Sequence, residues 1–232
     1  MRAAPRAVLF DAAGTLIELT EPVGETYARA FREHGVEISP WRLEEAFRRV
    51  LRKAPPLCFP DLDAEALLER EREAWREVVR QTLRAADSAA AARLRDEAAC
   101  QDALFAHYAT DRAWRLREGA AEGLDALRAA GFRLAVLSNF DGRLRGILAA
   151  LGLSRRLDAV FLPSDLGVAK PEPRAFHGAL ERLSVEAAQA VFVGDDPERD
   201  LAAARNAGLA AVDARSLATL AGLRSQVEEL LS

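Results

Sequence analysis

The stretch AVLFDAAGTL, residues 7–16, decides how the rest of the chain is organised. Four apolar residues, from Ala7 to Phe10, end at Asp11, and a glycine-containing turn follows. An apolar run of this length predicts a strand buried on both faces, as in the centre of a parallel sheet. In open α/β sheets ligands bind at the carboxyl ends of the strands. Asp11 is therefore a candidate nucleophile or metal ligand, although an Asp that only caps a following helix would give the same pattern.

Composition and charge narrow the class of protein. The 232 residues suffice for one large domain or for a core with an insertion. The net charge of -4 comes from interspersed acidic and basic residues, which argues against a nucleic-acid or membrane surface. Residues 1–6 do not resemble a signal peptide, and no apolar stretch approaches the roughly 20 residues of a membrane span. Cys58 and Cys100 lack metal-site or redox spacing, so we expect reduced thiols in a cytoplasmic protein.

Residues 18–116 have a helical composition, rich in Ala, Arg, Glu and Leu. Prolines that can open helices and the spacing of apolar residues predict four helices, at residues 22–33, 40–53, 64–84 and 88–110. A loop stiffened by three prolines, residues 54–61, separates the second helix from the third. The core of this helical unit is expected to contain the three tryptophans, Trp41, Trp75 and Trp114.

From Gly119 onward, short apolar runs alternate with amphipathic helical segments. The runs predict strands at residues 132–137, 159–162, 190–193 and 210–212. This alternation is typical of a parallel sheet with right-handed crossovers, and the strand before Asp11 belongs with it. The prediction is an α/β core made of residues 1–17 and 117–232, with residues 18–116 as an all-helical insertion.

Polar side chains follow four of the predicted strands or loops. They are Asp11 and Thr15; Ser138 and Asn139; Lys170; and Asp195, Asp196 and Asp200. Because the carboxyl ends of parallel strands share one edge, these groups can converge although they are far apart in sequence. Each alone could be a helix cap or a solvated charge. Together they fit phosphoryl transfer through a covalent carboxyl phosphate.

In such a reaction Asp11 would attack the phosphorus in line. Asp11 and Asp195 would hold a hard, oxygen-loving cation such as Mg²⁺, and Lys170 would neutralise phosphate charge. Ser138 and Asn139 would donate hydrogen bonds to the non-bridging oxygens in the transition state.

Two further carboxylates, Asp196 and Asp200, would orient the water around the metal without binding the metal directly. Thr15 is a further candidate phosphate contact.

The motifs resemble those of the haloacid dehalogenase-like hydrolase superfamily. The matching segments are Asp11-x-x-Gly14-Thr15-Leu16, Ser138-Asn139, Lys170-Pro171-x-Pro173, and Gly194-Asp195 followed by Asp200. The insertion after the first motif is similar to a helical cap of the C1 type, and Ser138 to Leu153 is most similar to the group named for haloacid dehalogenase-like hydrolase domain-containing protein 3. The resemblance implies a Rossmann-like core, a cap closing over the catalytic edge, Mg²⁺ and a small phosphorylated substrate.

One position departs from this pattern. Phosphatases of the superfamily carry a second Asp two residues after the nucleophile, which protonates the leaving group and later activates water, but this chain has Ala13. General acid-base catalysis typically contributes about 10²- to 10⁴-fold, or roughly 3 to 5 kcal/mol of barrier. The backbone carbonyl of Ala13 can still bind the metal, but the side chain cannot carry a proton.

Several functions therefore stay open. The chain could be a phosphohydrolase whose leaving group needs little protonation, such as an acyl phosphate or anhydride, or one whose acid comes from another group. It could resemble phosphonoacetaldehyde hydrolases, which have Ala at this position and a cap lysine as Schiff base, with Lys53 in that role. It could be a metal-independent 2-haloacid dehalogenase, which Asp195 and Asp200 argue against, or a binding or regulatory protein without turnover. Substrate choice is expected to depend on the loop at residues 54–61, and the protein is expected to be a monomer or homodimer.

Overall fold

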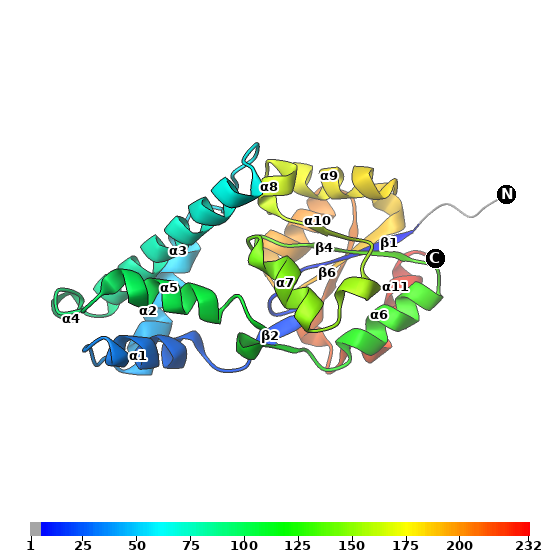
Figure 1. Ribbon diagram of the computed structural model, residues 1–232. Coiled ribbons are helices and arrows are strands. Elements are labelled where there is room, and N and C mark those ends of the chain that lie inside the picture. The colour runs from blue at the N-terminus through cyan, green and yellow to red at the C-terminus, as the bar shows by residue number, and fades with distance from the viewer. Residues whose placement is uncertain (1–5) are drawn as a thin grey trace. The chain divides into compact units, whose positions relative to one another are not determined.

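The computed structural model describes residues 6–232, and Pro5, expected just before the first strand, lies outside the described residues. Five parallel strands form a sheet in the order β5-β4-β1-β6-β7 (Figure 1). Their bounds are Ala7–Phe10 for β1, Arg133–Leu137 for β4, Ala159–Phe161 for β5, Ala190–Gly194 for β6 and Ala210–Asp213 for β7. The predicted parallel α/β sheet is confirmed, with the strand before Asp11 at its centre.

The strand order reverses at β1. After β1 the chain adds β4 and β5 on one side, and it then crosses to add β6 and β7 on the other. Phe10 is in register with Val136 of β4 and Val193 of β6, so the three central strands end at the same level. In doubly wound sheets this reversal opens a crevice at the carboxyl ends of the strands. The residues that follow β1 and β6 therefore face the same space.

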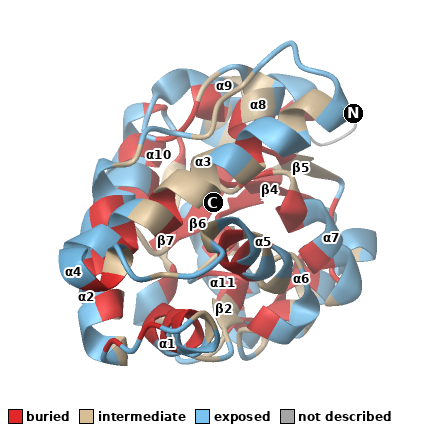
Figure 2. Ribbon diagram, turned by 60° about the vertical axis from the view of Figure 1, so that its left-hand side comes forward, coloured by how far each residue is buried: buried red, intermediate tan, exposed pale blue. Residues whose placement is uncertain are grey.

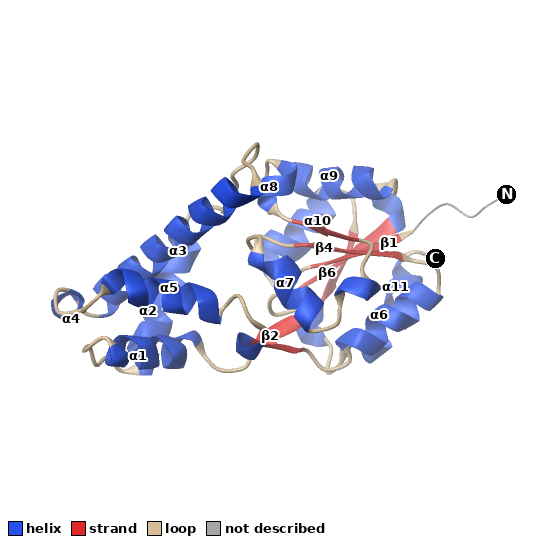
Figure 3. Cartoon of the chain, in the orientation of Figure 1, coloured by secondary structure: helices blue, strands red, loops and turns tan. Residues whose placement is uncertain are grey.

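Helices cover both faces of the sheet (Figure 3). They are α6 (Ala120–Ala129), α7 (Arg143–Ala150), α8 (Pro163–Leu166), α9 (Pro173–Leu183), α10 (Ala203–Asn206) and α11 (Leu223–Leu230). On one face α9 and α10 pack on apolar side chains of the strands, and the rings of Phe176 and Phe192 are 5.2 Å apart. Alternate residues of β1 and β4, such as Val8 and Leu134, are fully buried against the opposite layer. Figure 2 shows the central strands as almost wholly buried, as the continuous apolar runs predict.

The helical unit comprises residues Leu19–Pro56 and Leu62–Trp114. Its helices are α1 (Val23–Glu33), α2 (Pro40–Lys53), α3 (Ala64–Ala86), α4 (Ser88–Ala91) and α5 (Glu97–His107). Their core is centred on aromatic and aliphatic side chains of α1, such as Tyr27 and Phe31, packed against residues of the other helices. Both rings are almost completely buried.

Two predictions for this unit are wrong. The single helix expected at residues 88–110 is two helices, α4 and α5. The break occurs because Asp96 takes a left-handed backbone conformation, with φ of 46°, and its carboxylate caps α5 by accepting from Ala99 N. Trp41 is not in the core, since it is 67% exposed, whereas Trp114 is buried and Trp75 is half-buried.

The sheet unit comprises the chain up to Glu18, residues Leu57–Asp61 and residues Arg115–Ser232. The proline-rich loop therefore belongs in part to this unit, and Phe59 N donates to Ser164 Oγ of α8 at 3.1 Å. A second sheet contains only β2 (Ile17–Leu19) and β3 (Trp114–Leu116). Among residues 6–232, no helix combines the length and apolar character needed to cross a membrane. That the two units act as catalytic core and cap stays a prediction.

Candidate active site

Asp11 is held at the end of β1 by the sheet and by a tight turn. Its backbone N donates to Val193 O at 2.9 Å, which extends the pairing between β1 and β6 by one residue. The chain then reverses, with Gly14 N donating to Ile17 O at 2.8 Å. Gly14 has φ of 87°, and a Cβ placed on it would lie 2.6 Å from Asp195 Oδ2. Glycine is therefore required here both by backbone conformation and by the approach of the carboxylate.

Asp195 and Asp200 belong to the segment after β6. Asp195 directly follows Gly194, the last residue of the strand. The Oδ2 atom of Asp200 accepts hydrogen bonds from the backbone N of both Asp195 and Asp196, each at 3.1 Å. Asp200 thus fixes the conformation of the loop that carries Asp195. A Cβ on Gly194 would lie 2.4 Å from Asp200 Oδ2, so this carboxylate approaches the backbone too closely for a larger residue.

Lys170 joins the two acidic segments. Its ammonium Nζ donates to Asp11 Oδ1 at 2.8 Å and to Asp200 Oδ1 at 2.6 Å, and its side chain is only 3% exposed. Asn139 holds the Lys170 backbone, because Asn139 Nδ2 donates to Lys170 O at 2.8 Å and Asn139 Oδ1 accepts from Lys170 N at 2.9 Å. The segment after β4 therefore positions the lysine.

Three carboxylates cluster at the site, and the Lys170 ammonium contacts two of them. Asp11, Asp195 and Asp200 each offer an oxygen within 4.8 Å of the other two. Burial, and then the charges of Asp11 and Asp200, raise the pKa of Asp195 to about 6. Burial also raises the pKa of Asp200, against the opposing effect of Lys170. Burial acts to lower the pKa of Lys170, but the charges of Asp11 and Asp200 outweigh it and leave that pKa above its ordinary value. The cluster thus carries excess negative charge that a cation would relieve.

The other predicted site residues have different surroundings. Ser138 is buried and its Oγ accepts from Phe140 N at 3.4 Å. Thr15 is fully buried, and its Oγ1 has no hydrogen-bond partner among the described residues. Ala13 is half-buried and forms an isolated β-bridge with Ile17. The Asp196 carboxylate accepts from the backbone N of the next helical turn, as a helix cap does. Asp11, Lys170, Asp195 and Asp200 are therefore the side chains that converge.

Comparison with known proteins identifies the family. A family model described as haloacid dehalogenase-like hydrolase matches residues 5–208. The chain belongs to this family. Haloacid dehalogenase-like hydrolase domain-containing protein 3 of Mus musculus is 40% identical over 190 residues, covering 82% of this chain and 74% of the mouse protein. The resemblance inferred from the motifs is confirmed, and the protein is a hydrolase of the haloacid dehalogenase-like family.

Relatives within the family have different named activities. A phosphoglycolate phosphatase of Rhodospirillum rubrum is 33% identical, covering 90% of this chain and 78% of the relative. The solved structure of L-2-haloacid dehalogenase from Xanthobacter autotrophicus aligns with a TM-score of 0.62 and 26% identity, covering 98% of this chain and 84% of that one. Family membership alone therefore does not choose between phosphate and halide chemistry.

One ion pair in the loop after β4 has no counterpart in the sequence predictions. Arg143 donates from Nε to Asp141 Oδ1 at 2.8 Å and from Nη2 to Asp141 Oδ2 at 2.6 Å. The Asp141 side chain is fully buried and that of Arg143 is 5% exposed. Asp141 Oδ1 also accepts from Arg143 N, so the pair fixes the turn directly after Ser138 and Asn139. The Asp-x-Arg spacing was the only signal in the sequence, and the burial of the pair depends on the fold.

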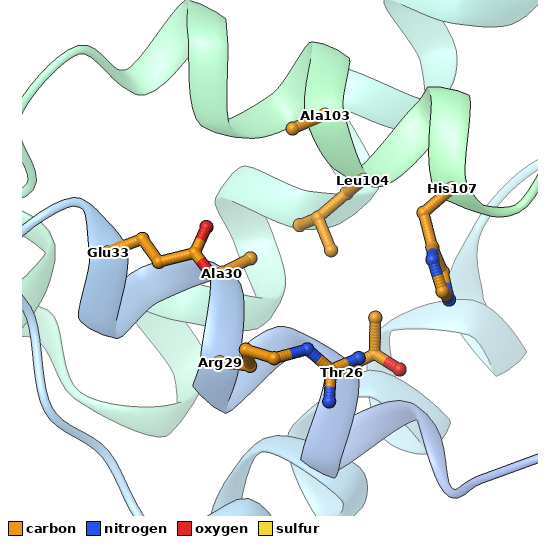
Figure 4. Close-up of a pocket in the computed structure, with 7 residues that line it drawn as sticks. All are labelled: Thr26, Arg29, Ala30, Glu33, Ala103, Leu104 and His107. Atoms are coloured by element: carbon orange, nitrogen blue, oxygen red, sulfur yellow. The ribbon is translucent and has the colours of Figure 1, made fainter.

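A separate small cavity of about 130 Å³ lies within the helical unit, between α1 and α5 (Figure 4). Thr26, Arg29 and His107 are among its lining residues. His107 Nε2 is buried and has no hydrogen-bond partner among the described residues. Burial, and then the charge of Arg29, lower the pKa of His107. The cavity shares no residue with the Asp11 cluster, and Lys53 does not line it.

Proposed function

We propose that the protein is a Mg²⁺-dependent phosphohydrolase that forms an aspartyl phosphate on Asp11. The observation that carries this proposal is the position of the Lys170 ammonium between Asp11 and Asp200, two carboxylates that form one cluster with Asp195. A buried nucleophile, a cation and two further carboxylates are the parts that transfer of a phosphoryl group requires. Residues 1–17 and 117–232 would form the catalytic core, and residues 18–116 a cap that contributes to substrate selection.

The residues fit a magnesium ion. Mg²⁺ prefers oxygen ligands, and the three carboxylates supply them within 4.8 Å of one another. The raised pKa of Asp195, about 6, reflects like charges that a divalent cation would offset. Asp11 and Asp195 would bind the metal, and the carbonyl of Ala13 would be a further ligand. When bound, the ion would neutralise phosphate charge and orient the substrate.

The chain's own residues would carry the reaction. An Asp11 oxygen attacks phosphorus, and Lys170 neutralises charge on the phosphoryl oxygens. Ser138 Oγ–H and the second N–H of the Asn139 amide donate to those oxygens, while the first N–H keeps its bond to the Lys170 carbonyl. The Thr15 hydroxyl, which lacks a partner among the described residues, is available to a phosphate oxygen or to water. Asp200 maintains the loop that carries Asp195.

A phosphatase among the relatives and a dehalogenase among the solved structures support different substrates. A 2-haloacid carries a carboxylate, and the two buried carboxylates and the half-buried Asp195, against one ammonium, would repel it unless a cation were present. The acidic cluster therefore favours the phosphate substrate with Mg²⁺. Ala13 favours a second candidate, a binding or regulatory protein that keeps the pocket without turnover.

The cytoplasmic location and the monomeric or homodimeric state stay predictions.

The test is phosphate release from p-nitrophenyl phosphate and acetyl phosphate, with Mg²⁺ and with EDTA. We expect Mg²⁺-dependent release that Asp11→Asn abolishes and that Asp63→Asn, an N-cap change in the helical unit, leaves intact. Release by Asp11→Asn at the wild-type rate would refute the mechanism. Absence of turnover by the wild type, with activity only in Ala13→Asp, would favour the binding protein. Halide release from 2-haloacids in the presence of EDTA would support the dehalogenase alternative. Borohydride trapping of an aldehyde on Lys53 would support the alternative that resembles phosphonoacetaldehyde hydrolases.

A further inference from the structure

The proton carriers of the sheet unit limit which substrates the site can cleave. Lys170 is the ammonium nearest to Asp11, and it already donates to two carboxylates. If it gave up a proton to a leaving group, Asp11 and Asp200 would lose the cation that offsets their charge in a buried place. Lys170 is therefore suited to neutralise charge and unsuited to protonate a departing oxygen.

Asp195 belongs to the cluster that would bind the metal, and other titratable groups of this unit have partners of their own. His177, the imidazole of the sheet unit, is hydrogen-bonded through Nε2 to Ala207 O at 3.0 Å. Cys58 Sγ donates to Pro163 O at 3.4 Å. The Asp141 carboxylate is bound by Arg143, and the Asp196 carboxylate caps a helical turn. Both tyrosines of the chain, Tyr27 and Tyr108, belong to the helical unit.

The two residues that follow Asp11 in the turn after β1 are alanines, whose side chains carry no proton. Ala12 is fully buried, whereas Ala13 is half-buried and pairs with Ile17 in a local β-bridge. The chain bends at Ala12, whose carbonyl accepts from the backbone N of Thr15, Leu16 and Ile17, so Ala12 and Ala13 form the start of the turn that follows Asp11. The two residues directly after the nucleophile therefore offer no acid for the first step and no base for the second.

We propose that the natural substrates are phosphoryl donors with acidic leaving groups, namely acyl phosphates or phosphoanhydrides. We further propose that the aspartyl phosphate accumulates during turnover because its hydrolysis is the slow step. This inference rests on the proposed function. Asp11 Oδ forms a bond to phosphorus while the bond from phosphorus to the leaving oxygen breaks. The leaving group departs with the electron pair as a carboxylate or phosphate, which needs no proton. Water then attacks the same phosphorus, the Asp11 carboxylate departs, and the water's protons pass to phosphate and solvent.

Both halves of the reaction have a measurable consequence. Without an acid, the rate of phosphorylation depends steeply on the acidity of the leaving group, so kcat/KM falls as the leaving group becomes more basic. Without a base, water attacks the phosphoenzyme slowly, so hydrolysis limits turnover. The limiting step is then common to all good substrates, and they share one kcat. The first turnover appears as a burst equal to the amount of enzyme.

The experiment compares acetyl phosphate and a series of aryl phosphates with phenols of graded acidity, under Mg²⁺, by quench flow. Three proteins are used: wild type, Ala13→Asp and the near-isosteric Ala13→Asn, which cannot carry a proton. We expect a steep fall of kcat/KM across the series, a common kcat for the good substrates and a stoichiometric burst in wild type and Ala13→Asn. Ala13→Asp should raise kcat/KM for the most basic phenols by about 10²- to 10⁴-fold and shorten the life of the phosphoenzyme.

The outcomes separate this inference from the proposed function. A flat dependence on leaving-group acidity in wild type, or steady turnover without a burst, would overturn the inference while leaving Asp11-dependent hydrolysis in place. Equal rescue by Ala13→Asn and Ala13→Asp would also overturn it, because the gain would then not come from a proton carrier. If no substrate in the series gives turnover or a burst that depends on Asp11, the proposed function itself fails.

Discussion

Lys170 in the sheet unit and Arg76 in the helical unit both pair with carboxylates, but in different surroundings. The Lys170 side chain is 3% exposed and lies between Asp11 and Asp200. The Arg76 side chain is 27% exposed and joins α3 to α5 through Asp102, whose side chain is 46% exposed. Water screens the second pair and hardly reaches the first. The comparison contrasts a buried cluster of charges at the edge of the sheet with an exposed pair that links two helices.

The two regions also differ in whether their positive and negative charges are equal in number. Arg76 and Asp102 compensate each other, with Nη2 of the arginine donating to Oδ1 at 2.8 Å and to Oδ2 at 3.1 Å. In the sheet unit three carboxylates lie within 4.8 Å of one another, and the one ammonium beside them contacts only Asp11 and Asp200. Such an excess lowers the stability of the folded state, so it is expected where binding of a cation or an anionic substrate makes up for it. Stability measurements can therefore tell the two regions apart without an assay.

The largest effect is expected for Lys170→Met. Removing the ammonium leaves Asp11 and Asp200 buried without their cation, which typically costs about 3–5 kcal/mol. Urea unfolding of the metal-free protein measures this cost. Lys53→Met is the matched control, because Lys53 is the other lysine of the chain and is exposed, and it should stay within about 0.5 kcal/mol of wild type. A similar loss in both variants would show that the cluster does not depend on Lys170.

If Lys170→Met does not fold, the double variant Asp11→Asn/Lys170→Met provides the test. It removes one of the carboxylates left unpaired, so it should recover part of the stability. No recovery would contradict the electrostatic account.

An opposite and smaller effect is expected for Asp195→Asn. The folded-state pKa of Asp195, about 6, lies above its ordinary value of 3.8. Protonation of Asp195 therefore contributes to the free energy of unfolding. This contribution is fully present below about pH 4 and is lost as the pH rises through 6. At neutral pH, Asp195→Asn should raise the metal-free stability by about 1 kcal/mol, or roughly 2–4 °C in Tm. Thermal unfolding between pH 4 and pH 8 measures this effect. The part of the decrease in Tm that comes from Asp195 as the pH rises through 6 should be present in the wild type and absent from Asp195→Asn.

Added Mg²⁺ sharpens that prediction. In the wild type the ion should raise Tm at neutral pH by mass action, and in Asp195→Asn this gain should be small or absent. Ca²⁺ and Na⁺ at matched ionic strength control for general screening. An equal gain from Mg²⁺ in both proteins would place the cation elsewhere.

The sequence predicts the sheet and its edge well, because the evidence for them is local. Buried strands are continuous apolar runs. Gly14, in the turn after β1, is required by its positive φ, and Gly194, at the end of β6, is required by the close approach of the Asp200 carboxylate. Topology then brings Asp11, Asp195 and Lys170 together without further information. The roles of polar groups are harder to predict, since an amide or carboxylate can serve several partners. Asn139 holds the Lys170 backbone through both of its amide atoms, which its type and spacing alone do not indicate.

The errors in the helical unit have a related cause. Residues 88–110 have high helix propensity throughout, and the break before α5 depends on the left-handed conformation of Asp96, which only the tertiary structure selects. Trp41 is apolar, yet its place near the start of α2 leaves it exposed. Similarly, Asp141 and Arg143 are two residues apart and resemble an exposed ion pair in the sequence, although both side chains are buried. Local pattern gives the elements, and burial of individual side chains follows from packing.

The smallest effect is expected at the surface pair in the helical unit. A double-mutant cycle with Arg76→Ala and Asp102→Ala isolates their coupling from the bond that Arg76 also makes to Glu69. The coupling should be about 0.5–1 kcal/mol and should fall as salt rises from 0.05 to about 1 M, because water and ions screen an exposed pair. Urea unfolding at both salt concentrations measures it. The matching cycle of Lys170→Met with Asp11→Asn should give a larger coupling that changes little with salt. If the two couplings proved equal in size and in salt dependence, the low exposure of Lys170 would have no electrostatic consequence, and the contrast between the two units would be one of position only.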